Sequence, residues 1–519
     1  MNLSPSEQYI LKIVFCLIGG VVIFLYQSAK ISLSFRRIML GITAGMCLLS
    51  YYHFGFPSSF IHYWEQFHYQ LTSKYFQELG YDGLYAASIE AQYQIAPDLP
   101  LQAIVRDLRN NELRSNQELE EFRHQIVQRF SPERWQEFVL DNSQYLLFIK
   151  DIFGIKQSEG ETKYTYLAFF DRIRQDHGFN ASPTWVFVAR MVSFGLPTEK
   201  QTLFYIASLD IVVILFMFFM MMRSYGFYTG CISIIIFSLG YGWHYHWVGG
   251  AFLRFDWLAA VVVSLCMLKK KHYVLAGIFL SYAVMVRLFP LMFLFGLIVK
   301  IIQSRITGKN LSWGFRFAKG FFIGILLFFL AGCFAGRGVN AWKEFALNTQ
   351  KHYHFRGTNH AGLQLLCMYD KKTLEGEPGL TWNQHMQKIR KERSFLITSG
   401  ALFVIGFLIL ALKKVEIDEA MGMGIVVIFA LTQLACYYWG MLLLISVRKN
   451  YVAVIIYLLY HIGLYSLLLK YTLPDEIVYG VLMSSGILLT LSIWILPDCV
   501  LTVQETRSIF QCNKHVFRR

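Results

Sequence analysis

Apolar segments of about 15 to 20 residues, separated by short basic loops, recur along most of this chain and restrict what it can fold into. A helix needs roughly 20 apolar residues to cross the hydrocarbon core of a bilayer, because each residue advances it by about 1.5 Å. Of the 519 residues, 55% are hydrophobic and only 16% are charged, against about 25% charged in soluble domains. The sequence therefore predicts an all-α polytopic membrane protein.

The lysines and arginines of the loops predict the topology. Lys30, Arg36 and Arg37 lie between the first two apolar segments without an acidic residue, so the positive-inside rule places this loop in the cytoplasm. Counted from there, about 13 transmembrane helices bring every short basic loop to the same side. The predicted organisation is two transmembrane helices in 1–53, an extracytoplasmic helical region in 54–200, further transmembrane helices in 201–336, a second extracytoplasmic loop in 337–395, transmembrane helices in 396–497 and a basic cytoplasmic tail in 498–519.

Two helix starts are visible in the first extracytoplasmic region. Ser115 to Glu118 has the pattern of a capping box. Ser131-Pro132 supplies a capping hydroxyl and a proline at the first helical position of a second helix. Between these starts, apolar residues recur at helical spacing at Leu119, Phe122, Ile126 and Phe130.

Several classes of function are excluded. The net charge of +14 is concentrated in the loops between apolar segments, so it indicates topology and not a nucleic-acid surface. The nine cysteines are scattered without a CxxC pair, which excludes a disulfide framework and a zinc site of the usual spacing. Motifs for binding ATP or a dinucleotide are absent from the sequence. We therefore expect no cofactor and no metal.

The stretch from His62 to Tyr85 places charged groups directly after the second apolar segment. Glu65 lies at the predicted membrane boundary, where a carboxylate can take a proton from an acceptor hydroxyl; the alternative is an interfacial glutamate paired with Lys74 or an arginine. His68 could bind a phosphate or orient Glu65, or it could be an interface residue. Lys74 and Asp82 are further substrate-binding candidates, or members of a solvated helix face.

Other charged residues form two groups. Arg106 and Asp107 suit contacts with an anion or a sugar, or a surface salt-bridge network. Arg254, Asp256 and Arg287 lie at the ends of predicted crossings, where charge is costly and marks either a ligand site or a buried ion pair. An arginine that faces a lipid phosphate could bind it in a bidentate manner.

Two outer loops and one aromatic turn add polar candidates. His354 and Asn359 could contact a sugar or a diphosphate, or belong to a histidine-rich solvated loop. His244 and His246 form an HxH pair without a third ligand nearby in sequence. Tyr438, in the sequence YYWG, could stack on a sugar or belong to the aromatic belt of a membrane interface.

The run FDWLAAVVVSLCMLKKKHYVLAGIFLSYAVMVRLFPLMFLFGLIVK, residues 255–300, and YYWG at 437–440 resemble the polyprenyl-phosphate-mannose-dependent mannosyltransferases of the GT-C superfamily, which are integral-membrane glycosyltransferases. The resemblance covers about residues 203–447. It implies that Glu65 is the catalytic carboxylate and that Arg287 is the basic residue before the proline turn. The family commonly carries an Asp or an acidic pair where this chain has the single Glu65.

The resemblance implies an inverting transfer from a polyprenyl-phosphate sugar to a glycan, lipid or protein acceptor, with Glu65 as general base. Polyprenyl phosphate is a good leaving group, so this reaction requires no metal. Asn180-Ala-Ser182 is followed by Pro183 and is a poor glycosylation site. This favours a bacterial plasma membrane with the site on its extracytoplasmic face.

Two other functions remain open. A transporter or flippase for an anionic lipid or sugar would also need intramembrane Arg and Asp residues. Against it, the sequence contains no visible inverted repeat. A catalytically silent membrane scaffold would use the aromatic residues only at the membrane interface.

Overall fold

Eight helices in the described part of the computed structural model are long and apolar enough to cross a membrane. The structure describes residues 4–52, 54, 60–97, 103–154, 172–193, 195–240, 249–353, 360–370, 379–471 and 476–516. The prediction of a polytopic helical membrane protein is confirmed at this level. The long helices are α1 (Pro5–Tyr26), α2 (Leu33–Tyr51), α10 (Lys200–Tyr225), η1 with α14 (Phe289–Phe293 and Leu294–Ile306), α15 (Ser312–Cys333), α20 (Ser394–Ala411), α23 (Tyr451–Lys470) and α24 (Glu476–Val516).

Shorter helices, most of them apolar, fill the interior of the bundle. Nearly every side chain of α11 and α12 is buried, as expected for helices that are apolar on all faces. These helices coincide with the remaining predicted crossings, and the count of about 13 transmembrane helices stays a prediction. They are α11 (Phe227–Leu239), α12 (Asp256–Lys269), α13 (Tyr273–Val286), α21 (Ile417–Gly422), α22 (Gly424–Leu431) and η2 (Cys436–Val447).

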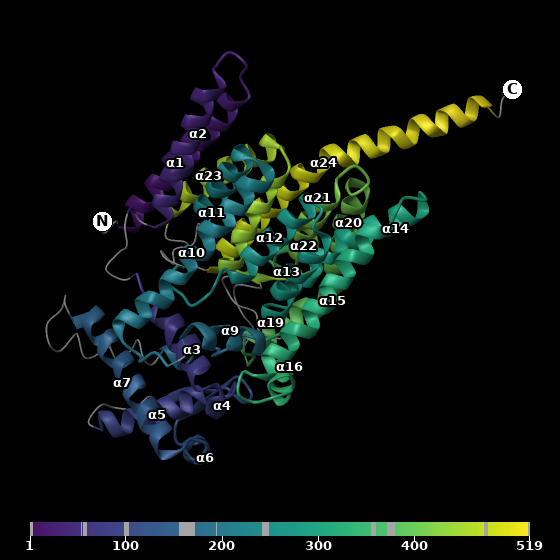
Figure 1. Ribbon diagram of the computed structural model, residues 1–519. Coiled ribbons are helices and arrows are strands. Elements are labelled where there is room, and N and C mark those ends of the chain that lie inside the picture. The colour runs from purple at the N-terminus through teal and green to yellow at the C-terminus, as the bar shows by residue number, and fades with distance from the viewer. Residues whose placement is uncertain are drawn as a thin grey trace.

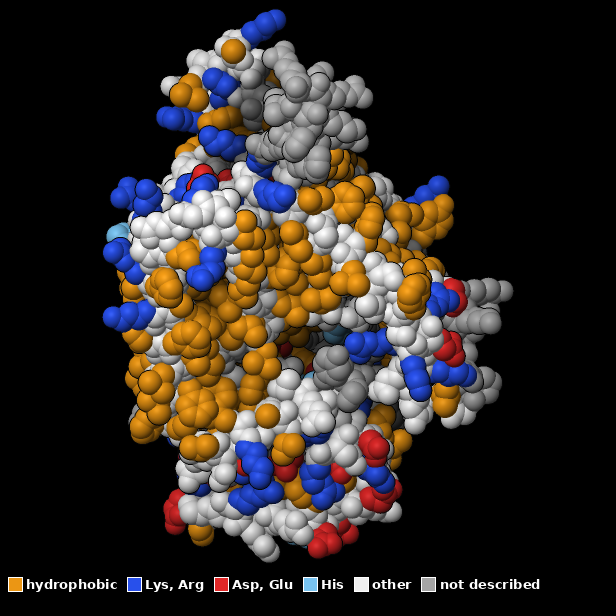
Figure 2. Space-filling model, turned by 90° about the vertical axis from the view of Figure 1, so that its right-hand side faces the viewer, with side chains coloured by type: hydrophobic (Ala, Val, Ile, Leu, Met, Phe, Trp, Pro, Cys, Tyr) orange, Lys and Arg blue, Asp and Glu red, His pale blue; other side chains and the backbone are white. Residues whose placement is uncertain are grey.

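The outer surface of the bundle is apolar. Figure 2 shows hydrophobic side chains covering much of the upper part of the molecule, whereas charged side chains gather on the lower part and at the top. A continuous apolar surface of this kind is costly in water and suits contact with lipid. Large exposed side chains that contribute to it include Phe24, Ile42, Phe219, Phe322 and Phe403.

A second, mostly helical unit, here called the lobe (residues 60–193), lies at one end of the bundle (Figure 1). It has a hydrophobic core of its own, which includes Phe67, Tyr75, Ile126 and Phe138. Its elements are α3 (Tyr63–Lys74), α4 (Phe76–Leu79), α5 (Leu84–Ile95), β1 (Ile104–Asp107), β2 (Glu112–Ser115), α6 (Glu120–Val127), α7 (Pro132–Gly154) and α9 (Pro183–Ser193).

The second predicted helix start in the lobe is confirmed, and the first is displaced. Ser131 Oγ accepts a hydrogen bond from Arg134 N at 3.3 Å at the start of α7. Ser115 Oγ accepts one from Glu118 N at 3.3 Å, but Ser115 ends β2, and α6 begins only at Glu120 after a turn. The apolar residues predicted to share a face are all buried: Leu119, Phe122, Ile126 and Phe130.

The hairpin of β1 and β2 departs from a purely helical lobe. The two strands pair antiparallel, with Asp107 opposite Glu112. Asn111 in the connecting turn has φ of 65°, a left-handed conformation that asparagine adopts more readily than most residues. An all-α description of the lobe was therefore wrong in this segment.

The region 337–395, predicted to be a second extracytoplasmic loop, is also folded where it is described. It contains α16 (Asn340–Tyr353), β3 (His360–Ala361), α17 (Leu363–Met368) and α19 (Trp382–Glu392), and β3 pairs with β4 (Leu434–Ala435) just before η2. At the other end of the chain, α24 continues past Pro497 and projects from the bundle (Figure 1). The predicted boundary at residue 498 therefore falls inside a helix.

Basic loops from distant parts of the chain meet at the end of the bundle away from the lobe, here called the basic end (residues 269–271, 413–414 and 448–449). Lys269 Nζ lies 3.5 Å from Asp418 Oδ2, and Arg448 Nη1 lies 2.5 Å from Asp498 Oδ2. These contacts join the end of α12 to α21, and the end of η2 to the middle of α24. The bundle thus has a lobe end and a basic end.

Candidate functional site

Helix α3, which carries Glu65, is a polar helix of the lobe that is buried where the lobe meets the bundle. Buried polar side chains require hydrogen-bond partners, and those of α3 find them on several neighbours. Gln66 Nε2 donates to Gly250 O at 3.3 Å, and Gln70 Nε2 donates to Thr198 Oγ1 at 3.0 Å. These bonds fix the rotation of α3 and leave 20% of the Glu65 side chain exposed at the boundary with the bundle.

The loop of residues 249–255, which leads into α12, is attached directly to the start of α3. Gly250 O accepts a hydrogen bond from His62 N at 3.0 Å. Gly250 has φ of +70°, and a Cβ atom there would lie 1.8 Å from Phe60 O. Only glycine fits this close approach of two backbones.

The far end of the same loop is held by α9 and α10. Trp185 Nε1 donates to Leu253 O at 3.4 Å. Asp210 Oδ1, on α10, accepts a hydrogen bond from Phe255 N at 3.2 Å. Together with Gly250, these contacts fix the position of Arg254.

Arg254 and Glu65 form an ion pair at the junction of lobe and bundle. Arg254 Nη2 lies 2.7 Å from Glu65 Oε2, and only 6% of the arginine side chain is exposed. The guanidinium carbon also lies 5.1 Å from the centre of the Tyr437 ring, in cation–π geometry. The sequence left open whether Glu65 pairs with an arginine, and the structure contains this pair.

Arg287 brings a second positive charge to the same region. It is the half-buried C-cap of α13, and its guanidinium carbon lies 6.0 Å from the ring centre of Tyr69, one turn beyond Glu65 on α3. Within the residues that the structure describes, no carboxylate lies in ion-pair contact with Arg287. Its charge is therefore balanced only at longer range.

Aromatic side chains enclose this region on the bundle side. The ring of Tyr438 packs against Phe289 with centroids 4.8 Å apart and against Trp257 at 5.6 Å. Tyr437 and Tyr438 are in contact at 4.5 Å. Figure 2 shows a hollow where the apolar surface meets the polar lower part, with acidic and histidine side chains at its depth.

Asp256 supports the structure of the site, but its carboxylate oxygens are bonded within the protein and do not face the site. Its Oδ2 accepts a hydrogen bond from Tyr282 OH at 2.9 Å, and its Oδ1 accepts one from Trp257 N at 2.6 Å. Both oxygens are thus engaged inside the protein. Asp256 fixes the first turn of α12 against α13.

His62 caps α3 beside the ion pair. Its Nδ1 accepts a hydrogen bond from Glu65 N at 3.2 Å, which requires an unprotonated nitrogen. Burial, followed by the charge of Arg254, lowers the pKa of His62 to about 4. The neutral imidazole therefore adds no further positive charge at neutral pH.

The structure places His68 in the core of the lobe and not beside Glu65. His68 Nδ1 lies 2.7 Å from Trp64 O, and Nε2 lies 2.7 Å from Tyr85 OH. Both ring nitrogens are used within the protein, so neither is available to a phosphate. The side chain links α3 to α5.

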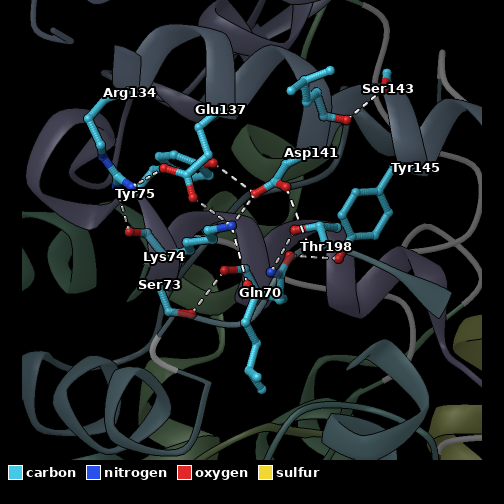
Figure 3. Close-up of polar contacts among 12 residues, drawn as sticks. Gln70, Ser73, Lys74, Tyr75, Arg134, Glu137, Asp141, Ser143, Tyr145 and Thr198 are labelled. Atoms are coloured by element: carbon cyan, nitrogen blue, oxygen red, sulfur yellow. Dashed lines mark hydrogen bonds and ion pairs between the residues drawn. The ribbon is translucent and has the colours of Figure 1, made fainter. Parts of the chain in front are cut away.

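Lys74 belongs to a buried network between α3 and α7, shown in Figure 3. Its Nζ lies 2.7 Å from Asp141 Oδ2 and 3.0 Å from Glu137 Oε1. Tyr75 OH donates to the same Asp141 oxygen at 2.8 Å. Lys74 is thus neither directed at a ligand nor part of a solvated face.

The other charged candidates of the lobe make local contacts. Asp82 lies 3.3 Å from Arg129 at the surface. Arg106 donates to Gln175 O and Asn111 O, each at 2.7 Å, and holds two backbone segments together. Asp107 is buried and pairs at 2.9 Å with the exposed Arg109, which follows it in the turn after β1.

Some candidates lie outside the described residues. His354 and Asn359 are among them, as are His244 and His246. In the described part of the chain, no group of three or more His, Cys, Asp or Glu side chains is placed to hold a metal ion.

Three residues that contribute to the site were not predicted from the sequence. Tyr69 follows Glu65 by one helical turn, and this spacing could have indicated it. Asp210 is a carboxylate within a long apolar helix, which is itself a signal of function or of a buried partner. Gly250 carries no such signal, because its role depends on a contact with a distant segment.

Comparison with known proteins gives no further identification. Neither a protein family, nor a curated protein, nor a solved structure was found to match this chain. The functional argument therefore rests on the residues and their geometry.

Proposed function

We propose that this protein is a membrane glycosyltransferase of the GT-C type. It transfers a sugar from a polyprenyl-phosphate donor to a glycan, lipid or protein acceptor on the extracytoplasmic face of the membrane. The observation that carries the proposal is the Glu65–Arg254 pair at 2.7 Å with Arg287 nearby, at the junction of a polar lobe and an apolar bundle. A lipid-linked phosphate sugar needs cationic, polar and apolar contacts at such a junction.

In the proposed step, Glu65 takes the proton of an acceptor hydroxyl as its oxygen attacks the anomeric carbon of the donor. The bond between that carbon and the phosphate oxygen breaks, and polyprenyl phosphate leaves with the electron pair. Attack opposite the leaving group inverts the anomeric configuration. A positioned base of this kind contributes about 10²-fold to 10⁴-fold.

Arg287 and Arg254 have distinct parts in this proposal. Arg287, which has no carboxylate in ion-pair contact among the described residues, binds the donor phosphate and stabilises its charge as it departs. Arg254 holds the Glu65 carboxylate in place and orients it. Its fork of five N–H donors allows it to keep this contact while it also donates to a phosphate.

The test is transfer from a labelled polyprenyl-phosphate sugar by the purified full-length protein. Glu65→Gln keeps the shape of the side chain and removes the base, so transfer should fall by at least about 10²-fold. Glu120→Gln, an exposed glutamate on α6, serves as the matched control and should keep the parent activity. If Glu65→Gln transfers sugar at the parent rate, the proposed mechanism is wrong.

Arg287→Gln tests the phosphate contact separately. The parent protein should bind polyprenyl phosphate more tightly than neutral polyprenol, and the variant should lose most of that preference. A charge-assisted contact to phosphate is roughly twice as strong as a neutral one. An unchanged preference would show that another group holds the phosphate.

The transporter or flippase remains the alternative, and the same variants distinguish it. A transporter would move a labelled lipid between leaflets without sugar transfer, and this movement would survive Glu65→Gln. Loss of sugar transfer with no lipid movement in either protein supports the glycosyltransferase.

A further inference from the structure

A cavity of about 650 Å³ lies at the basic end of the bundle, away from the Glu65–Arg254 pair. It is formed where α10, α12 and η2 end and where α11 and α23 begin, with Pro497 of α24 on one wall. Helix α10, with 26 residues, spans from the lobe to this cavity, a length of roughly 39 Å at 1.5 Å per residue. The proposed sugar transfer makes no use of it. Its volume is typical of ligand sites, about 300 to 1,000 Å³.

Arg448 forms a rigid, charge-balanced wall of the cavity. Its Nη1 lies 2.5 Å from Asp498 Oδ2 and also donates to Trp494 O at 3.2 Å. Its Nε lies 3.6 Å from Glu419 Oε2, a longer contact that leaves this carboxylate able to accept other hydrogen bonds. The wall thus offers an acceptor for hydroxyl groups.

Two lysines supply positive charge that the surroundings do not fully balance. Lys269 is 39% exposed, and among the described residues its ion-pair contact is with Asp418, at a length of 3.5 Å. Lys449 is exposed and has no ion-pair contact with any residue in the described part of the chain. Both line the cavity, together with Ser224 and Thr229. Two ammonium donors beside one volume suit a phosphate.

The cavity adjoins the lipid-facing surface of the bundle. Tyr451 and Pro497 line it, and the large apolar side chains next to them, Val452 and Leu496, are exposed. A ligand whose phosphate occupies the cavity can therefore lay hydrocarbon chains along α23 and α24. A soluble anion would gain nothing from this surface.

We propose that the cavity at the basic end binds the headgroup of an anionic phospholipid that carries hydroxyl groups, as phosphatidylglycerol does. Lys269 and Lys449 hold the phosphate, Glu419 accepts from the headgroup hydroxyls, and the acyl chains lie against α23 and α24. Basic pockets between helices at a membrane surface are suited to such headgroups. By the positive-inside rule this is the cytoplasmic leaflet.

Binding is measured with fluorescent short-chain phosphatidylglycerol and the full-length protein in a non-ionic detergent. Unlabelled short-chain phosphatidylglycerol, short-chain phosphatidylcholine and glycerol phosphate are the competitors. Lys269→Gln with Lys449→Gln should weaken binding about 25-fold, since each lysine near a charged lipid contributes about fivefold. Lys309→Gln with Lys413→Gln removes the same charge from exposed loops outside the cavity and should leave binding unchanged.

The outcomes separate the possible ligands. Displacement by phosphatidylglycerol, but not by phosphatidylcholine or glycerol phosphate, supports the proposal, and retention of binding by Lys269→Arg with Lys449→Arg adds to it. Equal displacement by glycerol phosphate would assign the site to a soluble phosphate ester and contradict the proposal of a lipid ligand. If both pairs of lysine substitutions weaken binding equally, the cavity is not the binding site. Because sugar transfer is measured separately, failure here leaves the proposed function untouched.

Discussion

The carboxylate of Glu65 and the guanidinium of Arg254 meet at 2.7 Å, although one belongs to the lobe and the other to the loop before α12. The pair is largely buried, so breaking it leaves one charge without its partner. Removal of one member of a buried pair is costly, typically about 3 to 5 kcal/mol, even where the intact pair adds little to stability. This contact therefore couples the position of the lobe to the chemistry proposed for the site.

Arg254→Gln should lower the turnover rate of sugar transfer by about 10²-fold, because the carboxylate of Glu65 loses the group that orients it. Arg254→Lys should recover only part of the rate, since an ammonium cannot form the planar fork or stack in the same way on Tyr437. Arg129→Gln, which breaks a surface contact of 3.3 Å with Asp82, is the control and should have no effect on transfer. Full activity of Arg254→Gln would contradict a positioning role.

Gly250→Ala should destabilise the protein and reduce transfer. The new Cβ would lie 1.8 Å from Phe60 O, so the loop that carries Arg254 has to move away from α3. Gly195→Ala is a matched control, because Gly195 has the same φ of +70° but nothing within 4 Å of the added Cβ. The free energy of unfolding of the control should fall only by the cost of placing an alanine in the left-handed conformation, about 1 to 2 kcal/mol. Both the midpoint of thermal unfolding and the rate of sugar transfer should be lower for Gly250→Ala than for Gly195→Ala.

Asp141→Ala should destabilise the lobe by about 3 kcal/mol, because Lys74 and Tyr75 lose a buried acceptor. Glu137→Gln removes the other carboxylate near Lys74, but Glu137 is 43% exposed against 8% for Asp141. Its contact is screened by water and should contribute less than about 1 kcal/mol. If Asp141→Ala and Glu137→Gln lower the midpoint of thermal unfolding equally, burial does not decide how much each carboxylate of the network in Figure 3 contributes to stability.

The stability of the lobe, and of helix α16 that contacts it through His352, should fall as the pH decreases from about 6.5 towards 4. Burial, followed by the charge of a neighbouring cation, lowers the pKa of His62 to about 4, of His177 to about 3 and of His352 to about 4. In this range the unfolded chain takes up protons that the folded chain does not, so the free energy of unfolding decreases; above about 6.5 the contribution is complete.

Thermal unfolding at about pH 7.5 and about pH 5 measures this dependence. His177→Gln keeps a donor for the side chain of Asn111, which lies 2.9 Å from His177 Nδ1, but cannot titrate. The variant should therefore show a shallower dependence on pH. A midpoint that rises on acidification would contradict the neutral state of these histidines.

The membrane class, the basic end and the start of α7 could be predicted from the sequence, because each depends on properties that are local along the chain. Hydrophobicity over about 20 residues decides whether a helix can enter lipid, and the charge of each loop is a simple sum. Ser131 and Pro132 likewise act on the next turn only. For the same reason, Glu65, Arg254 and Arg287 stood out as costly charges at the ends of apolar segments.

What only the tertiary structure decided is which of these charges meet. The sequence offered His68 and Lys74 as substrate-binding candidates beside Glu65, yet His68 faces Tyr85 and Lys74 faces Asp141, inside the lobe. Arg254 reaches Glu65 because the backbone of Gly250 approaches the start of α3 and because Asp210 holds the other end of the loop. Contacts of this kind depend on how distant segments pack, and residue types and spacing along the chain do not contain that information.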